Sequence, residues 1–106
     1  MTQPSKRLQF LEKMVRSGTE DPMAYYGLAM EYRNLERAPE ALALFQQLRA
    51  RKPDYVAMYL MCGQMVDKLL SDKAMAREWL EAGIEECRRS GNTHALSELE
   101  SALGEL

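Results

Sequence analysis

The chain has 106 residues, 46% hydrophobic and 28% charged, a composition typical of a globular protein with one domain. Its formal net charge of −2 argues against a nucleic-acid-binding protein, which usually carries a basic excess. No apolar run approaches the roughly 18 residues needed to span a bilayer, so no membrane partner is expected. The N-terminus lacks the apolar core of a signal peptide, and we therefore expect a cytoplasmic location.

The first two predicted helices lie before residue 35. Helical spacing of Leu8, Leu11 and Met14, with Phe10 beside them, predicts a helix over residues 5–17. Gly18 should end it, because glycine accepts the left-handed conformation at a helix C-terminus. Asp21-Pro22 then supplies an N-cap and a proline at the first helical position, which predicts a second helix to about residue 34.

Four more helices are predicted from the remaining capping signals. Ala38-Pro39 opens a helix that runs to about residue 51 and ends before Pro53. Asp54 is predicted to cap the next helix, over about 54–70, and Ser71-Asp72 the following one, over about 73–89. A last helix begins at Thr93. No stretch alternates with period two, so no sheet is expected, and the short connections make neighbouring helices antiparallel.

A repeat of about 34 residues runs through the chain. The first copy contributes Tyr25, Ala29 and Tyr32, then Ala41 and Phe45; the second contributes Tyr59, Gly63 and Val66, then Ala76 and Leu80. This spacing of aromatic and small residues, followed by Pro53 in the first copy, is typical of stacked helix-turn-helix arrays. Ala29 and Gly63 are expected where two helices of a pair approach closely.

These residues resemble the tetratricopeptide repeat. In that comparison Tyr25 stands for the family's Trp and Leu28-Ala29 for its Leu-Gly, whereas the second copy is weaker because Val66 replaces a Tyr. The resemblance implies an all-α, right-handed α-solenoid of antiparallel helix pairs with about six helices. It divides a single domain of residues 1–106 into a half-repeat helix at 5–18, repeats at 22–55 and 56–89, and a C-terminal capping helix at 92–106.

The resemblance also implies function: non-catalytic binding of another protein, as an adaptor or scaffold. In this family the first helix of each pair lines the concave face, so the residues opposite the packing side are the expected peptide-binding groove. They are Met23, Tyr26, Gly27, Met30, Arg33, Asn34, Ala57, Leu60, Met61, Gln64, Asp67 and Lys68. Gly27 is expected to leave the backbone approachable, the methionines to offer adaptable contacts, and Arg33 and Lys68 to meet an acidic group on a bound peptide or helix.

Two alternatives stay open. The terminal helices could already cover this face. The chain could instead assemble with copies of itself, because residues 1–18 carry four basic residues against one Glu while residues 92–106 carry only acidic ones.

An enzyme has little support in the sequence. His94 is expected at the surface, Cys62 and Cys87 as small buried hydrophobic residues, and Trp79 packed against a neighbouring helix. The cysteines lack metal-ligand or redox spacing, so neither a cofactor nor a metal is expected.

Overall fold

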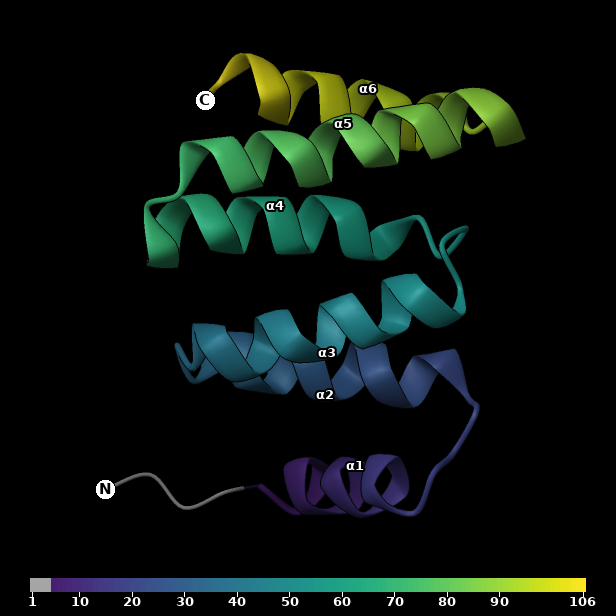
Figure 1. The fold of residues 1–106 in the computed structure, drawn as a ribbon, viewed down its shortest axis with the longest axis vertical. Helices are drawn as coiled ribbons and strands as arrows, with labels where there is room; N and C mark the ends of the chain where they lie inside the picture. Colours follow the sequence, from purple (N-terminus) through teal and green to yellow (C-terminus); the bar gives the residue numbers. More distant parts are fainter. Residues whose placement is uncertain (1–4) are drawn as a thin grey trace. The chain divides into compact units, whose positions relative to one another are not determined.

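The computed structural model describes residues 5–106, which form six α-helices and no strand (Figure 1). The helices are α1 (Lys6–Arg16), α2 (Pro22–Asn34), α3 (Ala38–Arg51), α4 (Ala57–Leu70), α5 (Lys73–Ser90) and α6 (Thr93–Gly104). The all-α fold of helix pairs predicted from the repeat is confirmed. The chain divides into two compact units, one ending at Arg51 (unit 1, α1–α3) and one over Lys52–Leu106 (unit 2, α4–α6).

Unit 1 is built on the α2–α3 pair, with α1 packed on α2. The predicted caps hold: the Asp21 side chain accepts a hydrogen bond from the Met23 backbone N–H at 3.0 Å, and Gly18, just after α1, has φ +85°. The repeat residues Tyr25, Ala29 and Phe45 are almost fully buried. Their burial explains why the sequence keeps aromatic and small residues at these spacings.

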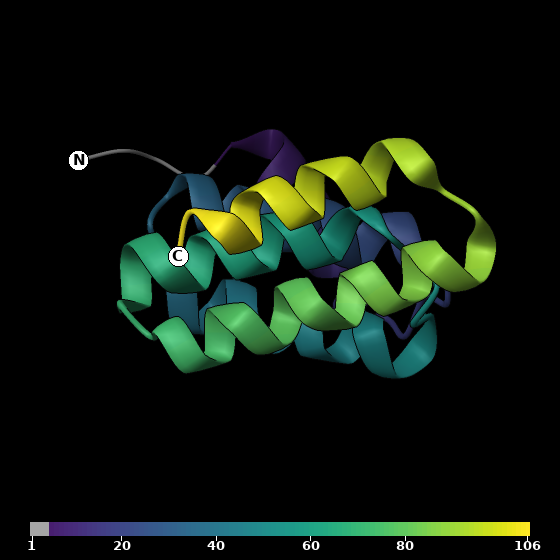
Figure 2. The ribbon, with the colours of Figure 1, turned by 90° about the horizontal axis from the view of Figure 1, so that it is seen from above.

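Unit 2 pairs α4 with α5, and α6 packs against both (Figures 1 and 2). The close approach predicted at Gly63 is present. A Cβ there would lie 2.7 Å from Leu80 Cδ2 and 3.4 Å from the Ala76 carbonyl oxygen. Glycine at this position therefore lets α4 and α5 come together, since any side chain would collide with Leu80.

One predicted cap is wrong. Asp54 does not cap α4, which begins at Ala57 after Val56 with no side-chain hydrogen bond at its N-terminus. Asp54 instead lies in a turn where the Tyr55 N–H bonds the Lys52 carbonyl, and its carboxylate lies 3.6 Å from the Lys52 ammonium. The turn places the carboxylate three residues before the helix, too early to serve the first-turn donors.

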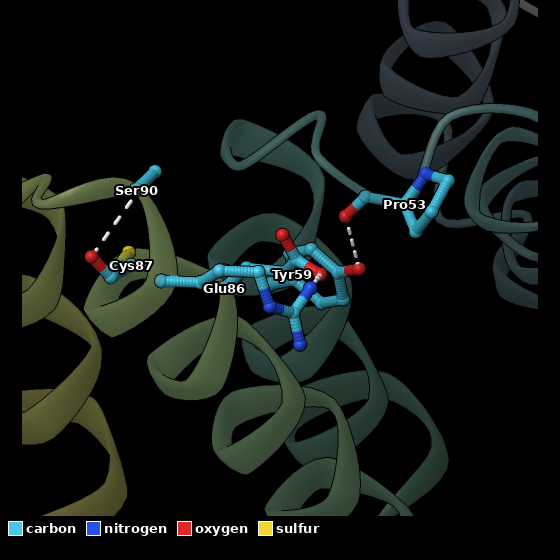
Figure 3. Close-up of polar contacts among 6 residues, drawn as sticks. Pro53, Tyr59, Glu86, Cys87 and Ser90 are labelled. Atoms are coloured by element: carbon cyan, nitrogen blue, oxygen red, sulfur yellow. Dashed lines mark hydrogen bonds and ion pairs between the residues drawn. The ribbon is translucent and has the colours of Figure 1, made fainter.

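The end of α5 follows the prediction. Gly91 adopts φ +75° and its N–H bonds the Cys87 carbonyl. The Ser90 hydroxyl also donates to that carbonyl, at 3.5 Å, and Glu86, one turn earlier, pairs with Arg89 (Figure 3). The Cys87 carbonyl, in the last turn of α5, thus has partners before the chain turns into α6.

Candidate functional site

The predicted binding residues of α2 differ in how much solvent they meet. Met23 is 58% exposed and Asn34 is exposed, whereas Tyr26, Met30 and Arg33 are half-buried. The Tyr26 ring packs edge-on against Phe45 of α3, with centroids 6.4 Å apart. Burial raises the pKa of Tyr26, against a smaller opposing effect from the positive charge of Arg33. Tyr26 thus presents a neutral hydroxyl at the edge of the unit 1 core.

Gly27 is the exception among these residues. It is buried, and a Cβ at this position would lie 3.3 Å from both the Arg7 guanidinium and Leu11 Cδ1 of α1. The backbone approach that Gly27 permits is therefore used by α1, and the expectation of an approachable backbone here is wrong. The ion pair between Arg7 and Glu31, at 3.0 Å, holds α1 over this part of α2.

The predicted residues of α4 lie along its solvent-facing side. Ala57 and Lys68 are exposed, and the others, Leu60, Met61, Gln64 and Asp67, are half-buried. The Asp67 carboxylate pairs with the ammonium of Lys73 at the start of α5. That pairing leaves Lys68 as the exposed charge at the C-terminal end of the α4 face.

A groove of about 350 Å³ runs between α4 and α6 within unit 2 (the α4–α6 groove). Two predicted residues, Leu60 and Gln64, line its α4 side. Its other wall comes from α6: Ser97, Glu98, Ser101, Ala102 and Glu105. None of these five residues, the last of which directly follows α6, was predicted as part of the site. Their three- and four-residue spacing puts them on one helix face, and they bring the C-terminal helix beside α4, as the alternative of a terminal helix covering this face supposed.

The chemistry of the α4–α6 groove differs from what the sequence predicted. Glu98 and Glu105 place carboxylates on its α6 wall, beside the apolar Leu60. Glu98 Oε1 lies 3.3 Å from His94 Nε2, one turn earlier on the same helix. Leu60 and two carboxylates thus line the α4–α6 groove, whereas Arg33 and Lys68, which were expected to meet an acidic group, do not line it.

Comparison with solved structures relates the chain to two structures of a tetratricopeptide repeat domain protein from Salinibacter ruber. A crystal structure matches with 36% identity and a TM-score of 0.73, over 80% of this chain and 93% of the other. A solution NMR structure matches with 37% identity and a TM-score of 0.75, over 81% and 86%. This chain belongs to the tetratricopeptide repeat family. No protein-family model and no curated protein matches it.

As a tetratricopeptide repeat protein, the chain uses its motif residues for packing. Tyr25 and Tyr59 are both buried, as are the small residues Ala29 and Gly63. Their burial separates the residues that make the fold from those that could meet a partner. In unit 2, Leu60 and Gln64 of the second group line the α4–α6 groove.

The side chains considered for catalysis lie either exposed at the surface or buried in the core. The His94 side chain is 91% exposed and faces Glu98, as a surface residue. Cys62 and Cys87 are buried thiols outside any disulfide, and burial, followed by the charge of Glu86, raises the pKa of Cys87. A raised pKa makes that thiol a poor nucleophile. Trp79 is buried against Tyr59, with ring centroids 6.0 Å apart, which confirms the packing role.

Within residues 5–106, no group of three or more His, Cys, Asp or Glu side chains could hold a metal ion. Among the six helices, none combines the length and apolar character required to cross a bilayer.

Proposed function

We propose that this tetratricopeptide repeat chain is a non-catalytic adaptor that binds a peptide or helix on the solvent-facing sides of α2 and α4. The family is generally a scaffold for protein interaction, which supports the class of function. The observation that carries the proposal is the α4–α6 groove, because two residues predicted from the repeat register, Leu60 and Gln64, line it. We retain residues 22–55 and 56–89 as the proposed repeat boundaries.

The groove's lining indicates the kind of segment that would bind. Its volume of about 350 Å³ lies near the lower end of ligand pockets, which suits one anchoring side chain of a larger partner. An apolar side chain would rest on Leu60, and a Lys or Arg nearby would meet Glu98 or Glu105. On α2, the exposed thioether of Met23 offers an adaptable apolar contact.

The thiol form of Cys62 and Cys87 supports a reducing, cytoplasmic setting as part of this proposal.

Peptide display against the natural chain tests the proposal. Selected peptides are synthesised and titrated calorimetrically against the natural chain, Leu60→Ala and the double variant Glu98→Gln, Glu105→Gln. We expect selection of peptides with an apolar residue beside Lys or Arg, and roughly tenfold weaker binding to either variant. Leu69→Ala is the matched control, because Leu69 lies on the same helix, is 38% exposed and does not line the groove.

Two results would count against the proposal. Failure to select any peptide would remove the groove as a peptide site. Selected peptides that bind all variants equally would place binding on another surface. Capture from the source cell lysate, comparing the natural chain with a Tyr26→Ala, Leu60→Ala variant, would then identify partners that depend on the predicted face.

A further inference from the structure

A second groove in unit 2 lies between α5 and α6 and shares no residue with the α4–α6 groove (the α5–α6 groove). Its volume is about 540 Å³. Ile84, 7% exposed, and the half-buried Leu103 supply its apolar surface. Charged side chains surround them: Arg77, Glu81, Glu85, Arg88 and Glu100.

The charges around the α5–α6 groove are not balanced. Arg88 lies 3.8 Å from Glu100 across the groove, so these two charges offset one another. Glu81 and Glu85, exposed and one helical turn apart on α5, form no ion pair with any residue in 5–106. Arg77, one turn before Glu81 on α5, also forms no ion pair in that range. With two arginines against three glutamates, the lining has a net charge of −1, and the carboxylates of Glu81 and Glu85 lie beside the apolar strip.

The outer face of α1 carries the complementary features. Phe10 is 63% exposed, more than any other large hydrophobic side chain in the described chain. Lys6 and Lys13 lie one turn before and one turn after it, on the same helix face. Neither lysine forms an ion pair within residues 5–106, and this face is opposite to the one that buries Leu8.

We infer that α1 of one copy docks in the α5–α6 groove of a second copy, so that the chain assembles head to tail. Phe10 would cover Ile84 and Leu103, and Lys6 and Lys13 would meet the carboxylates of Glu81 and Glu85. Charge complementarity selects this occupant, since an exposed aromatic side chain between two lysines faces an apolar strip beside two glutamates. This contact uses neither α2 nor the α4–α6 groove, so it is independent of the proposed peptide binding.

The repeat register supports the same arrangement. Leu11 and Met14 lie 34 residues before Phe45 and Leu48, which makes α1 equivalent to α3, the second helix of a pair. In unit 1 a second helix packs on the first helix of its pair, as α3 does on α2. If α1 of another copy docks beside α6, it takes the place of the second helix of a pair next to α6. The order of the repeats then continues from one copy to the next.

Such a contact is heterologous, because the two surfaces that meet are different. After two copies have docked, the pair still has one free α1 and one free groove, so association continues to larger species as concentration rises. Its ion pairs lie at the surface and are screened by salt. Sedimentation velocity from about 10 µM to about 1 mM, at about 50 and 500 mM NaCl, should show mass rising with concentration and falling with salt.

Complementary variants test the docking directly. Phe10→Ala with Lys13→Ala removes the α1 surface, and Glu81→Lys with Glu85→Lys reverses the groove. Each double variant alone should be monomeric with unchanged helical circular dichroism, because all four side chains are exposed. Their mixture should form a single 1:1 dimer, since one copy retains a working α1 and the other a working groove. Glu20→Lys and Leu69→Ala, altered away from both surfaces, should assemble like the natural chain.

Three results would overturn the inference. The natural chain could stay monomeric over the whole concentration range at low salt. The two double variants could each still assemble, which would place the contact elsewhere. Their mixture could fail to form the dimer while both remain folded. All three are read without any peptide, so they are distinct from failure of the peptide-binding proposal.

Discussion

Tyr25 and Tyr59, 34 residues apart, make the same hydrogen bond. The Tyr25 hydroxyl donates to the Thr19 carbonyl at 2.9 Å, and the Tyr59 hydroxyl donates to the Pro53 carbonyl (Figure 3). Each carbonyl lies six residues upstream, in the segment that leads into the first helix of a repeat. The tyrosine that replaces the family's Trp therefore also secures the incoming chain.

Tyr25→Phe and Tyr59→Phe test that bond while keeping the buried ring. Each should lower the free energy of unfolding by about 0.5–1.5 kcal/mol, the usual net value of one hydrogen bond. Urea unfolding followed by circular dichroism measures the change. Leu69→Ala, at an exposed leucine of α4, is the control. No loss of stability in either variant would mean that the hydroxyls do not hold these segments.

Gly83→Ala should destabilise unit 2. A Cβ at this position would lie 2.6 Å from Tyr59 Cβ and 3.1 Å from Leu99 Cδ1. Tyr59 Cβ is fixed to its helix backbone and cannot move aside, so we expect the overpacking penalty of about 1–3 kcal/mol to exceed the gain from helix propensity. Gly104→Ala is the matched control.

A Cβ at Gly104 meets nothing within 4 Å, so this substitution should be neutral or slightly stabilising. Both variants are measured by thermal unfolding. Equal stability of the two would contradict the close packing of α4, α5 and α6 at Gly83.

Leu99→Ala should show that α6 is part of the core and not an accessory helix. Leu99 is 1% exposed, so its truncation removes apolar contact and leaves a cavity. The free energy of unfolding should fall by about 2–5 kcal/mol. Leu69→Ala, at an exposed leucine on α4, should change it by less than about 0.5 kcal/mol. A small effect at Leu99 would mean that α6 is loosely attached.

Tyr32 should give the protein a pH-dependent stability in the alkaline range. Burial, the hydrogen bond that its hydroxyl donates to Glu12 at 2.5 Å and the charge of that carboxylate raise the pKa of Tyr32 from 10.0 to about 12. The contribution is fully present below pH 10.0. It is lost between pH 10.0 and about 12, where the unfolded chain releases a proton that the folded chain retains.

Ultraviolet titration of tyrosinate, comparing the natural chain with Tyr32→Phe, measures this directly. The absorbance step removed by the substitution should have its midpoint near pH 12. If the step that the substitution removes instead has its midpoint near pH 10.0, the coupling of Tyr32 to Glu12 is contradicted.

The two cysteines should be unreactive in the folded protein. Both are buried, and burial raises the pKa of the Cys87 thiol, so little thiolate is available to a disulfide reagent near neutral pH. Reaction should be slow in buffer and complete in urea for both thiols. Cys62→Ser isolates Cys87, and reaction of that variant at the rate of an exposed thiol would contradict its burial.

Much of the fold could be predicted because its signals are local. Asp21, Asp72 and Gly91 mark helix ends through hydrogen bonds or conformations set within a few residues, and the structure confirms all three. Asp54 misled the prediction because its nearest partner is Lys52 in the preceding turn. A capping residue can form competing local contacts, and the sequence does not show which will be made.

The candidate site was less predictable, because its surroundings come from elements distant in sequence. Gly27 reads as an open backbone position until Leu11 of α1 is placed over it. Leu60 and Gln64 read as part of an exposed face until α6 supplies the opposite wall of their groove. Whether one face of a helix is covered depends on how another helix packs against it. The spacing of residues within the first helix does not reveal this.

The sequence by itself determined the helix pairs, their repeat of about 34 residues and the residues that pack between them. Hydrophobic periodicity and helix capping depend on residues within a few turns of one another, so both can be recognised in the sequence. Only the tertiary structure decided which predicted surface residues remain accessible, and that acidic side chains of α6 line the groove beside α4. Those features arise from contacts between helices far apart in sequence, where packing and charge are set jointly by both partners.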